Sequence, residues 1–247
     1  NLRTLVGSIA VIYILIFSAQ FASFSTIAMN TSNDEHSLSE SPLSSFSNRA
    51  ASSGWFSTGS SSTDVGAGPM ATGFGNVVIG GVFGDSDSSG NAVSATINFG
   101  SQTVSSGAAY STAYLAGADE QGNWKWATAG QVSGNFPEAG IYGLDVSEIN
   151  GNTLATGMFY GTLTLGSHSV TSTGYYDAFI AEADSNGNWL WVTALHGAAD
   201  AYTDQTATTL DVVWGTAATY DTNGNAYVGG MFLGNTDIGN NAGQSGD

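Results

Sequence analysis

The side chains best suited to chemistry in this sequence are carboxylates and hydroxyls, because the chain contains no cysteine and only three histidines. The segment Asp85-Ser86-Asp87-Ser88-Ser89-Gly90 is typical of the first half of an oxygen-ligand calcium loop, with Asp85, Asp87 and Ser89 as candidate ligands. The twelfth position of such a loop is Thr96, so the bidentate glutamate is missing. A solvated Asp/Ser turn is the alternative, and the sequence favours it. Calcium is the only cofactor that this pattern leaves open.

No catalytic set of residues emerges from the rest of the chain. The histidines, His36, His168 and His196, do not recur at matching places in the repeats described below, which argues against a Ser-His-Asp triad or a histidine metal site. Several carboxylates are spread along the chain without a spacing that selects a pair: Asp145, Glu148, Asp177, Asp200, Asp204 and Asp211. We therefore predict that the protein is not an enzyme. Glycoside chemistry by paired carboxylates stays open as an alternative.

The charge balance restricts the partners. The formal net charge is −17, and the only basic residues are Arg3, Arg49 and Lys125. Nucleic acids and anionic membrane surfaces are poor partners for such a chain, because binding them requires basic side chains. Hydrophobic residues make up 42% of the chain and charged residues 9%, with 34 glycines, which favours short strands joined by tight turns over helices.

The first fifty residues differ in composition from the rest. Arg3 precedes an apolar run over residues 5–17, which is shorter than the roughly 20 residues of a membrane-spanning helix and is typical of a signal peptide. We expect residues 1–28 to be a signal peptide cleaved after Ala28, or alternatively a retained N-terminal anchor. Residues 29–50 are rich in Ser and Asn and predict a disordered linker. The chain is thus expected to be extracellular or at the cell surface.

The remaining segment, residues 51–247, contains an internal repeat. Residues 113–129 (AYLAGADEQGNWKWATA) and 178–194 (AFIAEADSNGNWLWVTA) align without a gap, and a second element, of the type GNAYVGGMF, begins at Gly75, Gly151 and Gly224. The sequence pattern of one unit predicts four strands. The first two are joined by a Gly-Asn turn, and a polar connector with a short Ser/Thr segment leads to the third, such as 177–183. A DxNGN turn then leads to the fourth, such as 189–195. The first unit is entered near Trp55, and the last stops before its third strand, which gives about two and a half repeats.

Tryptophan and glycine recur at fixed places in these units. Trp124 and Trp126 are two residues apart, as are Trp189 and Trp191, so each pair is expected on one face of its strand, where it packs against the next unit. Small residues at matching places predict close approach of neighbouring backbones or a bulge: Gly80, Gly81, Gly157, Gly229 and Gly230.

These motifs resemble the bacterial and archaeal SBBP-type β-propeller repeats, over about residues 51–247. The matching segments are GNAYVGGMF at 224–232, DAFIA at 177–181 and DSNGNWLW at 184–191; Gly117 and Glu182 stand where the family often has Lys. The resemblance implies an all-β fold, a partial β-propeller of four-stranded antiparallel blades, here with an N-terminal hydrophobic helix. Because a closed propeller needs at least four blades, further blades are expected in the full-length chain.

The functional expectation is a secreted or cell-surface, non-enzymatic repeat protein that serves in adhesion or binds a glycan or protein ligand. Two alternatives stay open: an extracellular polysaccharide hydrolase or lyase on a propeller scaffold, and a structural envelope or filament subunit that keeps its N-terminal helix.

Overall fold

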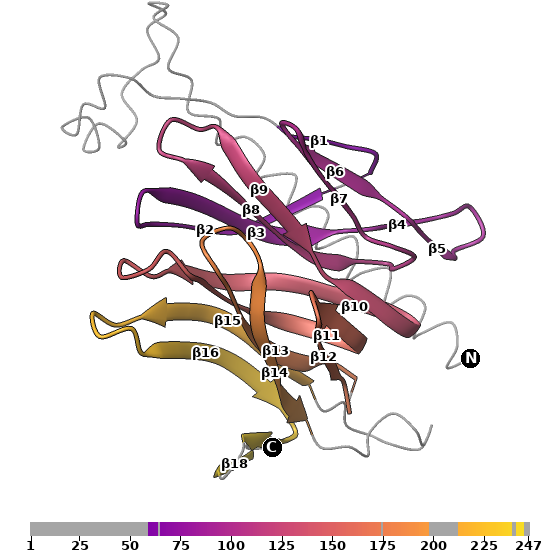
Figure 1. The fold of residues 1–247 in the computed structure, drawn as a ribbon. Helices are drawn as coiled ribbons and strands as arrows, with labels where there is room; N and C mark the ends of the chain where they lie inside the picture. Colours follow the sequence, from indigo (N-terminus) through magenta and orange to yellow (C-terminus); the bar gives the residue numbers. More distant parts are fainter. Residues whose placement is uncertain (1–58, 64, 174, 198–211, 239–240, 245–247) are drawn as a thin grey trace, which may run out of the picture. The chain divides into compact units, whose positions relative to one another are not determined.

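The computed structural model describes residues 59–63, 65–173, 175–197, 212–238 and 241–244, and these residues form strands and turns without any helix (Figure 1). They all belong to the unit Ser57–Asp247, one of two into which the chain divides. No helix of this described part is long and apolar enough to cross a membrane. The expected signal peptide or anchor (1–28), the linker (29–50) and Trp55 lie outside the described residues.

The first sheet has four antiparallel strands in the order β2-β3-β8-β9. Their bounds are β2 (Val65–Gly73), β3 (Asn76–Phe83), β8 (Thr112–Asp119) and β9 (Trp124–Ala129). Two small hairpins interrupt the connection from β3 to β8: β4 (Asp85–Ser86) with β5 (Ala92–Val93), and β6 (Thr96–Phe99) with β7 (Gln102–Ser105). The short strand β1 (Gly59–Ser61) pairs with β6.

The second sheet repeats this plan. Its main path runs β10 (Gln131–Val146), β11 (Thr153–Leu165), β13 (Asp177–Ala183) and β14 (Trp189–Gly197), and β12 (His168–Thr171) forms a hairpin with the end of β11. A third pair, β15 (Val212–Tyr220) with β16 (Ala226–Leu233), forms a two-stranded sheet. The hairpin β17 (Asn235–Ile238) with β18 (Asn241–Gln244) pairs with the end of β14.

The expected all-β class, the antiparallel pairing and the strand order within a unit are confirmed. No sheet closes into a barrel, and no closed propeller is formed, among the residues that the structure describes. The predicted N-terminal hydrophobic helix falls on residues that are not described. The predicted third and fourth strands of the second unit, 177–183 and 189–195, correspond to β13 and β14.

The first and second sheets pack face to face around one apolar core (Figure 1). Val78, Leu115 and Trp126 of the first sheet meet Ile141 and Phe159 of the second in this core. A smaller cluster lies on the other face of the first sheet, where Tyr114 packs against residues of the β6–β7 hairpin, including Phe99. The first sheet therefore has two apolar faces, one covered by the second sheet and the other by the β6–β7 hairpin.

Glycine permits the closest approaches, as the sequence predicted. A Cβ atom placed on Gly81, Gly157 or Gly230 would lie 2.2, 1.8 and 2.1 Å, respectively, from a carbonyl oxygen of the preceding strand. In all three pairs the preceding strand carries a bulge near this point. The recurring glycine therefore lets a bulged strand and its neighbour come together without a steric clash.

The expectation that each tryptophan pair shares one face was wrong. Trp126 lies opposite Gly117 while Trp124 lies opposite the adjacent Ala118, so Lys125 between them is the extra residue of a bulge. Trp126 consequently faces the second sheet, whereas Trp124 packs on the other face against Phe99, with ring centroids 4.9 Å apart.

The same shift separates the pair of the second sheet. Trp191 lies opposite Glu182 and Trp189 opposite Ala183. A bulge inserts one residue and reverses the alternation of side chains, which period-two reasoning does not detect. The broader expectation of packing between sheets holds, because Trp126 and Trp189 are buried in the shared core.

The end of the fourth strand of a unit pairs with the following unit at three places in the chain. Gly59–Ser61 pairs with β6, residues 131–133 pair with residues 162–164 at the end of β11, and His196 and Gly197 pair with β17. In each case the segment that follows one unit joins the small hairpin of the next unit. Successive sheets are therefore linked by backbone hydrogen bonds as well as by apolar packing.

Candidate functional site

The turn between β2 and β3 holds an exposed aromatic side chain in a strained backbone conformation. Gly73 pairs with Asn76, which leaves Phe74 and Gly75 as a two-residue turn with φ angles of 52° and 75°. Such a turn favours Asn or Gly at its first position, and a left-handed conformation costs another residue about 1–2 kcal/mol. All other positive φ angles in the described residues belong to glycine. The fold thus bears a local cost to hold a phenylalanine that is 54% exposed.

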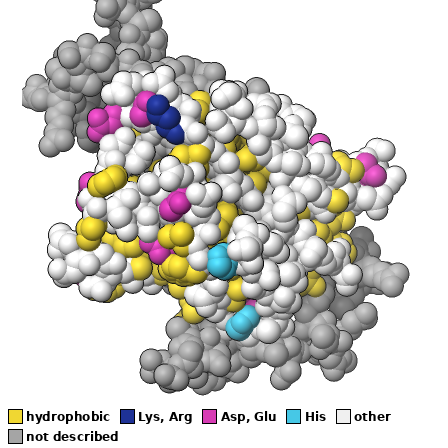
Figure 2. Space-filling model, in the orientation of Figure 1, with side chains coloured by type: hydrophobic (Ala, Val, Ile, Leu, Met, Phe, Trp, Pro, Cys, Tyr) yellow, Lys and Arg dark blue, Asp and Glu magenta, His cyan; other side chains and the backbone are white. Residues whose placement is uncertain are grey.

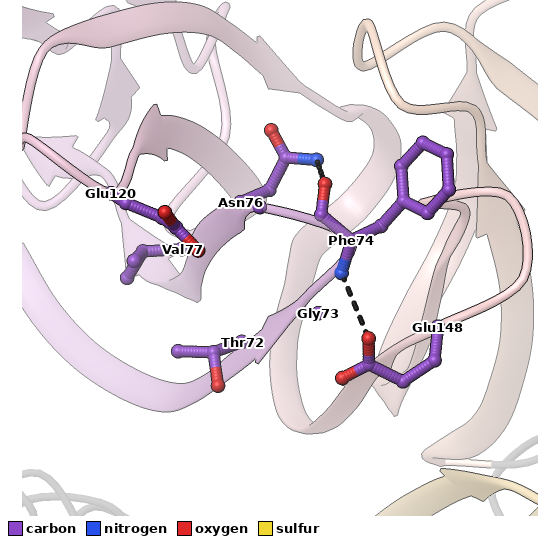
Figure 3. Close-up of a pocket in the computed structure, with 8 residues that line it drawn as sticks. Thr72, Gly73, Phe74, Asn76, Val77, Glu120 and Glu148 are labelled. Carbon is purple, nitrogen blue, oxygen red and sulfur yellow. Dashed lines mark hydrogen bonds between the residues drawn. The ribbon is translucent and has the colours of Figure 1, made fainter.

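An open cavity of about 410 Å³ surrounds this turn (Figure 3). Its lining comes from three turns that are far apart in the sequence: Thr72, Phe74 and Asn76 from β2 and β3, Glu120 from the β8–β9 turn, and Glu148 from the β10–β11 turn. Hydrogen bonds fix the turn, because the Phe74 N–H donates to Glu148 Oε2 (3.1 Å) and Asn76 Nδ2 donates to the Phe74 carbonyl (3.2 Å).

The Phe74 ring also reaches the second sheet. A Cβ atom on Gly151 would lie 3.0 Å from Phe74 Cδ1 and 3.1 Å from Ser185 Cβ. The ring therefore lies beside the β10–β11 turn of the second sheet, and the same turn contributes Glu148 to the cavity.

The cavity is acidic. Glu120 and Glu148 line it and no basic side chain does. Lys125 is the only lysine or arginine among the described residues, and it forms an ion pair with Asp119, with Nζ 2.8 Å from Oδ2. Figure 2 shows acidic side chains at several places on one face of the molecule and basic side chains at one place. An anionic ligand would be repelled from the cavity, whereas a neutral polyol or a cation would find hydrogen-bond acceptors.

The candidate calcium ligands lie on the hairpin of β4 and β5. Asp87 Oδ1 accepts the N–H groups of Ser89 (2.8 Å) and Asn91 (2.9 Å), and Asp87 Oδ2 accepts Asn91 Nδ2 (3.1 Å). Asp85 Oδ1 accepts the N–H of Ser86 (2.7 Å). The hydrogen bond from the Asn91 backbone is the main reason why the pKa of Asp87 lies below its ordinary value.

This arrangement is one of four similar turns with the pattern Asp-x-x-Gly-Asn. The others begin at Asp119, Asp184 and Asp221, and in each the Asp carboxylate accepts the N–H groups of the second and fourth following residues and the side-chain amide of the Asn. The geometry at Asp87 is therefore that of a self-contained turn, as the alternative interpretation expects. The calcium site at Asp85, Asp87 and Ser89 stays a prediction. No group of three His, Asp or Glu side chains suited to a metal ion occurs in the described part of the chain.

The other candidate carboxylates serve different parts of the structure. Asp145 Oδ2 accepts the Tyr220 N–H (2.7 Å) and so links the second sheet to β15, while Glu148 enters the cavity described above. Asp200, Asp204 and Asp211 lie outside the described residues.

Asp177 is fully buried at the start of β13, where it holds the end of β14. Its carboxylate accepts the N–H groups of Gly197 (2.8 Å) and Thr173 (2.7 Å), and His196 Nδ1 lies 2.7 Å from Oδ2. At the matching place in the first sheet, the Thr112 hydroxyl donates to the Gly130 carbonyl (2.8 Å). The shared position indicates that this contact fastens strand ends in both units.

A second cluster gathers tyrosines around a shielded carboxylate. The Tyr176 hydroxyl donates to Glu138 Oε2, and the rings of Tyr175 and Tyr176 lie 4.6 Å apart beside Tyr160. Burial raises the pKa of Glu138, and the hydrogen bond from Tyr176 offsets part of that rise. Burial, together with the charge of Glu138, raises the pKa of Tyr142 to about 12. The rings of Tyr175 and Tyr176 pack against Tyr160 and against each other.

Comparison with known proteins does not extend these observations. No protein-family model and no curated protein sequence matches the chain. Its possible function must therefore be argued from the residues themselves.

Sequence reasoning missed Phe74, Asn76 and Glu120 as site residues. One signal for Phe74 was present: the Gly-Asn pair that starts each second strand is preceded by Asn150 and Asn223 in two copies and by Phe74 in the first. Glu120 could not have been assigned, because nothing local in the sequence indicates that the β8–β9 turn lies beside the β2–β3 turn.

Proposed function

We propose that this chain is an extracellular or cell-surface binding module built from β-propeller repeats of the SBBP type, and that it binds a glycan at the cavity around Phe74. Its export rests on the apolar N-terminal segment, and its propeller assignment on the repeat motifs together with the stacked four-stranded sheets. The proposed activity is non-enzymatic adhesion.

The single observation that carries the proposal is the strained, exposed Phe74. A bulky residue at positive φ persists only where something other than local stability retains it, and such positions concentrate at ligand sites. The hydrogen bond from the Phe74 N–H to Glu148 Oε2 holds the backbone of the turn, and the side chain is 54% exposed.

The groups around the ring match the surface of a sugar. An aromatic face packs against the C–H face of a pyranose, while hydroxyl groups at the ring edge donate to carboxylates and exchange hydrogen bonds with an amide. Phe74 supplies the aromatic face, Glu120 and Glu148 supply the carboxylates, and Asn76 supplies the amide. The acidity of the cavity favours neutral sugars and amino sugars over uronic acids.

Replacement of Phe74 by Asn provides the test. Asn tolerates the left-handed conformation, so Phe74→Asn is expected to raise the free energy of unfolding by about 1 kcal/mol while weakening oligosaccharide binding at least about tenfold. Binding is measured by calorimetry or surface plasmon resonance with neutral, amino-sugar and uronic-acid oligosaccharides.

Phe136→Asn is the matched control, because Phe136 is 60% exposed and does not line the cavity. Equal losses of affinity in the two variants would contradict a site at Phe74. Failure of every oligosaccharide to bind would contradict the proposed ligand class, and preference for uronic acids would contradict the electrostatic argument.

A second candidate function, polysaccharide cleavage, is favoured by one observation: two carboxylates, Glu120 and Glu148, line the same cavity. Hydrolysis of a glycosidic bond uses a pair of carboxyl groups, one as acid and one as base or nucleophile. Incubation of the chain with the bound oligosaccharide separates the two functions. If the chain cleaves the oligosaccharide, and if Glu120→Gln abolishes this cleavage but not binding, the enzymatic proposal replaces the adhesion proposal.

A further inference from the structure

Three Asn-Gly pairs occur in the sequence, and each lies in a turn between two strands: Asn150-Gly151 between β10 and β11, Asn186-Gly187 between β13 and β14, and Asn223-Gly224 between β15 and β16. An asparagine followed by glycine is especially prone to spontaneous deamidation, because glycine has no side chain to shield its backbone nitrogen. None of these asparagines lines the cavity at Phe74.

Deamidation needs only the asparagine, the glycine nitrogen and water. The backbone nitrogen of the glycine gives up its proton and attacks Cγ of the asparagine side chain. A new C–N bond closes a succinimide ring, and the side-chain amide leaves as ammonia. Water then adds to one of the two ring carbonyls and opens the ring, which leaves aspartate or isoaspartate in place of the asparagine.

In each of the three turns the attacking nitrogen is already held by a hydrogen bond to a carbonyl of the same turn. A glycine nitrogen fixed in this way cannot reach Cγ, so the turn must open before the ring can close. The rate of deamidation therefore follows the free energy of local opening. The three bonds run from the Gly151 N–H to the Ser147 carbonyl (2.9 Å), from the Gly187 N–H to the Asp184 carbonyl (2.9 Å) and from the Gly224 N–H to the Asp221 carbonyl (3.0 Å).

Two of the glycines are covered by the first sheet. Gly187 is buried, and a Cβ atom there would lie 2.4 Å from Cε3 of Trp126. Gly151 is also buried, and a Cβ atom there would lie 3.0 Å from Cδ1 of Phe74. Opening of either turn has to move an aromatic ring away from the glycine, which adds to the cost of the reaction.

The third glycine, Gly224, is exposed, and so is Asn223 beside it. The only atom within 4 Å of a Cβ placed on Gly224 is Cδ1 of Ile149, at 3.2 Å, the far end of a flexible side chain. The turn joins the two-stranded sheet of β15 and β16, and every residue of β16 except Val228 is exposed. Little packing therefore opposes the opening of this turn.

We propose that Asn223 is a deamidation site of the folded protein, and that the stacked sheets protect Asn150 and Asn186 from the same reaction. Asn223 converts to aspartate and isoaspartate as the protein ages, while the other two asparagines keep their amides. The modification does not depend on glycan binding.

The reaction alters the end of the β15–β16 hairpin. In the intact turn, Asp221 Oδ1 accepts the N–H groups of Asn223 (2.9 Å) and Asn225 (2.8 Å), and Asp221 Oδ2 accepts Asn225 Nδ2 (2.7 Å). Isoaspartate inserts a methylene group into the backbone of this turn, and either product places a second negative charge near Asp221. Deamidation is therefore expected to loosen the hairpin irreversibly.

Peptide mapping measures all three sites in one sample. The full chain is incubated in its folded state at mildly alkaline pH, and aliquots are digested with chymotrypsin and analysed by mass spectrometry. Isoaspartate is identified by its methylation with an isoaspartyl methyltransferase. We expect Asn223 to lose its amide at least about tenfold faster than Asn150 or Asn186, which corresponds to ~1.4 kcal/mol in the free energy of opening.

Incubation in denaturing urea is the control for sequence effects. Each of the three asparagines is followed by Gly-Asn, so the unfolded chain is expected to react at similar rates at all three sites. Phe74→Gly tests the role of cover, because Gly accepts the positive φ and the ring beside Gly151 is removed. This variant is expected to accelerate deamidation of Asn150 alone.

Asn223→Ser tests the structural consequence, because it removes the reactive amide and keeps the N–H that donates to Asp221. Hydrogen exchange in β15 and β16 is expected to become faster as the unmodified chain ages and to stay unchanged in the aged variant. The same acceleration in the variant would overturn the proposed loosening.

Three results would overturn the site assignment. The first is equal rates at the three asparagines in the folded chain. The second is a spread of rates in urea as large as that in the folded chain, because the sequence rather than the fold would then set the difference. The third is an unchanged rate at Asn150 in Phe74→Gly, because cover of the glycine would then not control the reaction.

Discussion

At the scale of single residues, backbone strain and local hydrogen bonding distinguish a candidate ligand-binding residue from a structural one. Phe74 occupies a backbone conformation that suits Asn or Gly, and its ring is exposed beside two glutamates. The Asp residues of the four Asp-x-x-Gly-Asn turns represent the opposite case, because every carboxylate is satisfied by N–H groups of its own turn. Unexplained strain at Phe74 and complete local satisfaction at Asp87 therefore lead to different expectations about ligands.

Glu138 gives a prediction with a definite sign. Its pKa is raised by burial, so the folded protein binds this proton more tightly than the unfolded chain does. The buried charge is a cost at neutral pH that disappears as the pH falls through the raised pKa toward the ordinary value near 4.5. Glu138→Gln, which keeps an acceptor for Tyr176, is expected to raise Tm at pH 7 by about 2–4 °C and to have little effect at pH 4. A stabilisation that is the same at both pH values, measured by thermal unfolding, would contradict this account.

The turns of one sheet serve as packing surfaces for the next. Gly187 has a φ of 83°, and a Cβ atom there would lie 2.4 Å from Cε3 of Trp126 in the first sheet. Gly90 occupies the same place in its own Asp-x-x-Gly-Asn turn with a φ of 80°, but nothing lies within 4 Å of its added Cβ. The two glycines therefore share the conformational constraint and differ only in the neighbouring ring.

This pair allows the packing contribution to be separated from backbone strain. Gly90→Ala is expected to lower the free energy of unfolding by about 1–2 kcal/mol through strain alone. Gly187→Ala is expected to cost about 1–3 kcal/mol more, because the Trp126 ring must move. Urea unfolding followed by tryptophan fluorescence measures both. Equal losses would mean that the indole is not held against the turn.

Much of the secondary structure could be predicted from the sequence, because strands and turns here are specified locally. Asn-Gly and Asp-x-x-Gly-Asn segments marked the hairpins, and the repeated motifs marked β13 and β14. The faces of Trp124 and Trp126 could not be predicted, since a bulge at Lys125 reverses the alternation without a distinctive residue to mark it. The cavity was missed for a related reason: its lining comes from turns on different sheets, and their proximity is decided by tertiary packing.

At the scale of the whole molecule, the packing of one sheet on the next contributes to stability. Two phenylalanines at equivalent places in successive units allow this contribution to be tested. Phe159 and Phe232 hold the same place in their units, but Phe159 is buried in the core shared by the first two sheets. Phe159→Ala is expected to lower the free energy of unfolding by about 3–5 kcal/mol.

Phe232→Ala is expected to cost less than Phe159→Ala, because the Phe232 side chain is 36% exposed whereas Phe159 is fully buried. Chemical denaturation of the two variants, monitored by far-UV circular dichroism, makes the comparison. A loss at Phe232 as large as that at Phe159 would show that the third sheet is covered in solution.

The backbone pairing between the end of one unit and the small hairpin of the next has an evolutionary consequence. Main-chain ladders accept almost any side chain, and the same junction occurs at Gly59–Ser61, at residues 131–133 and at His196 and Gly197. A tandem duplication or deletion in the gene that cuts at equivalent points of two units would recreate this junction without compensating mutations. Array length in such a protein can consequently drift by recombination while each unit retains its fold.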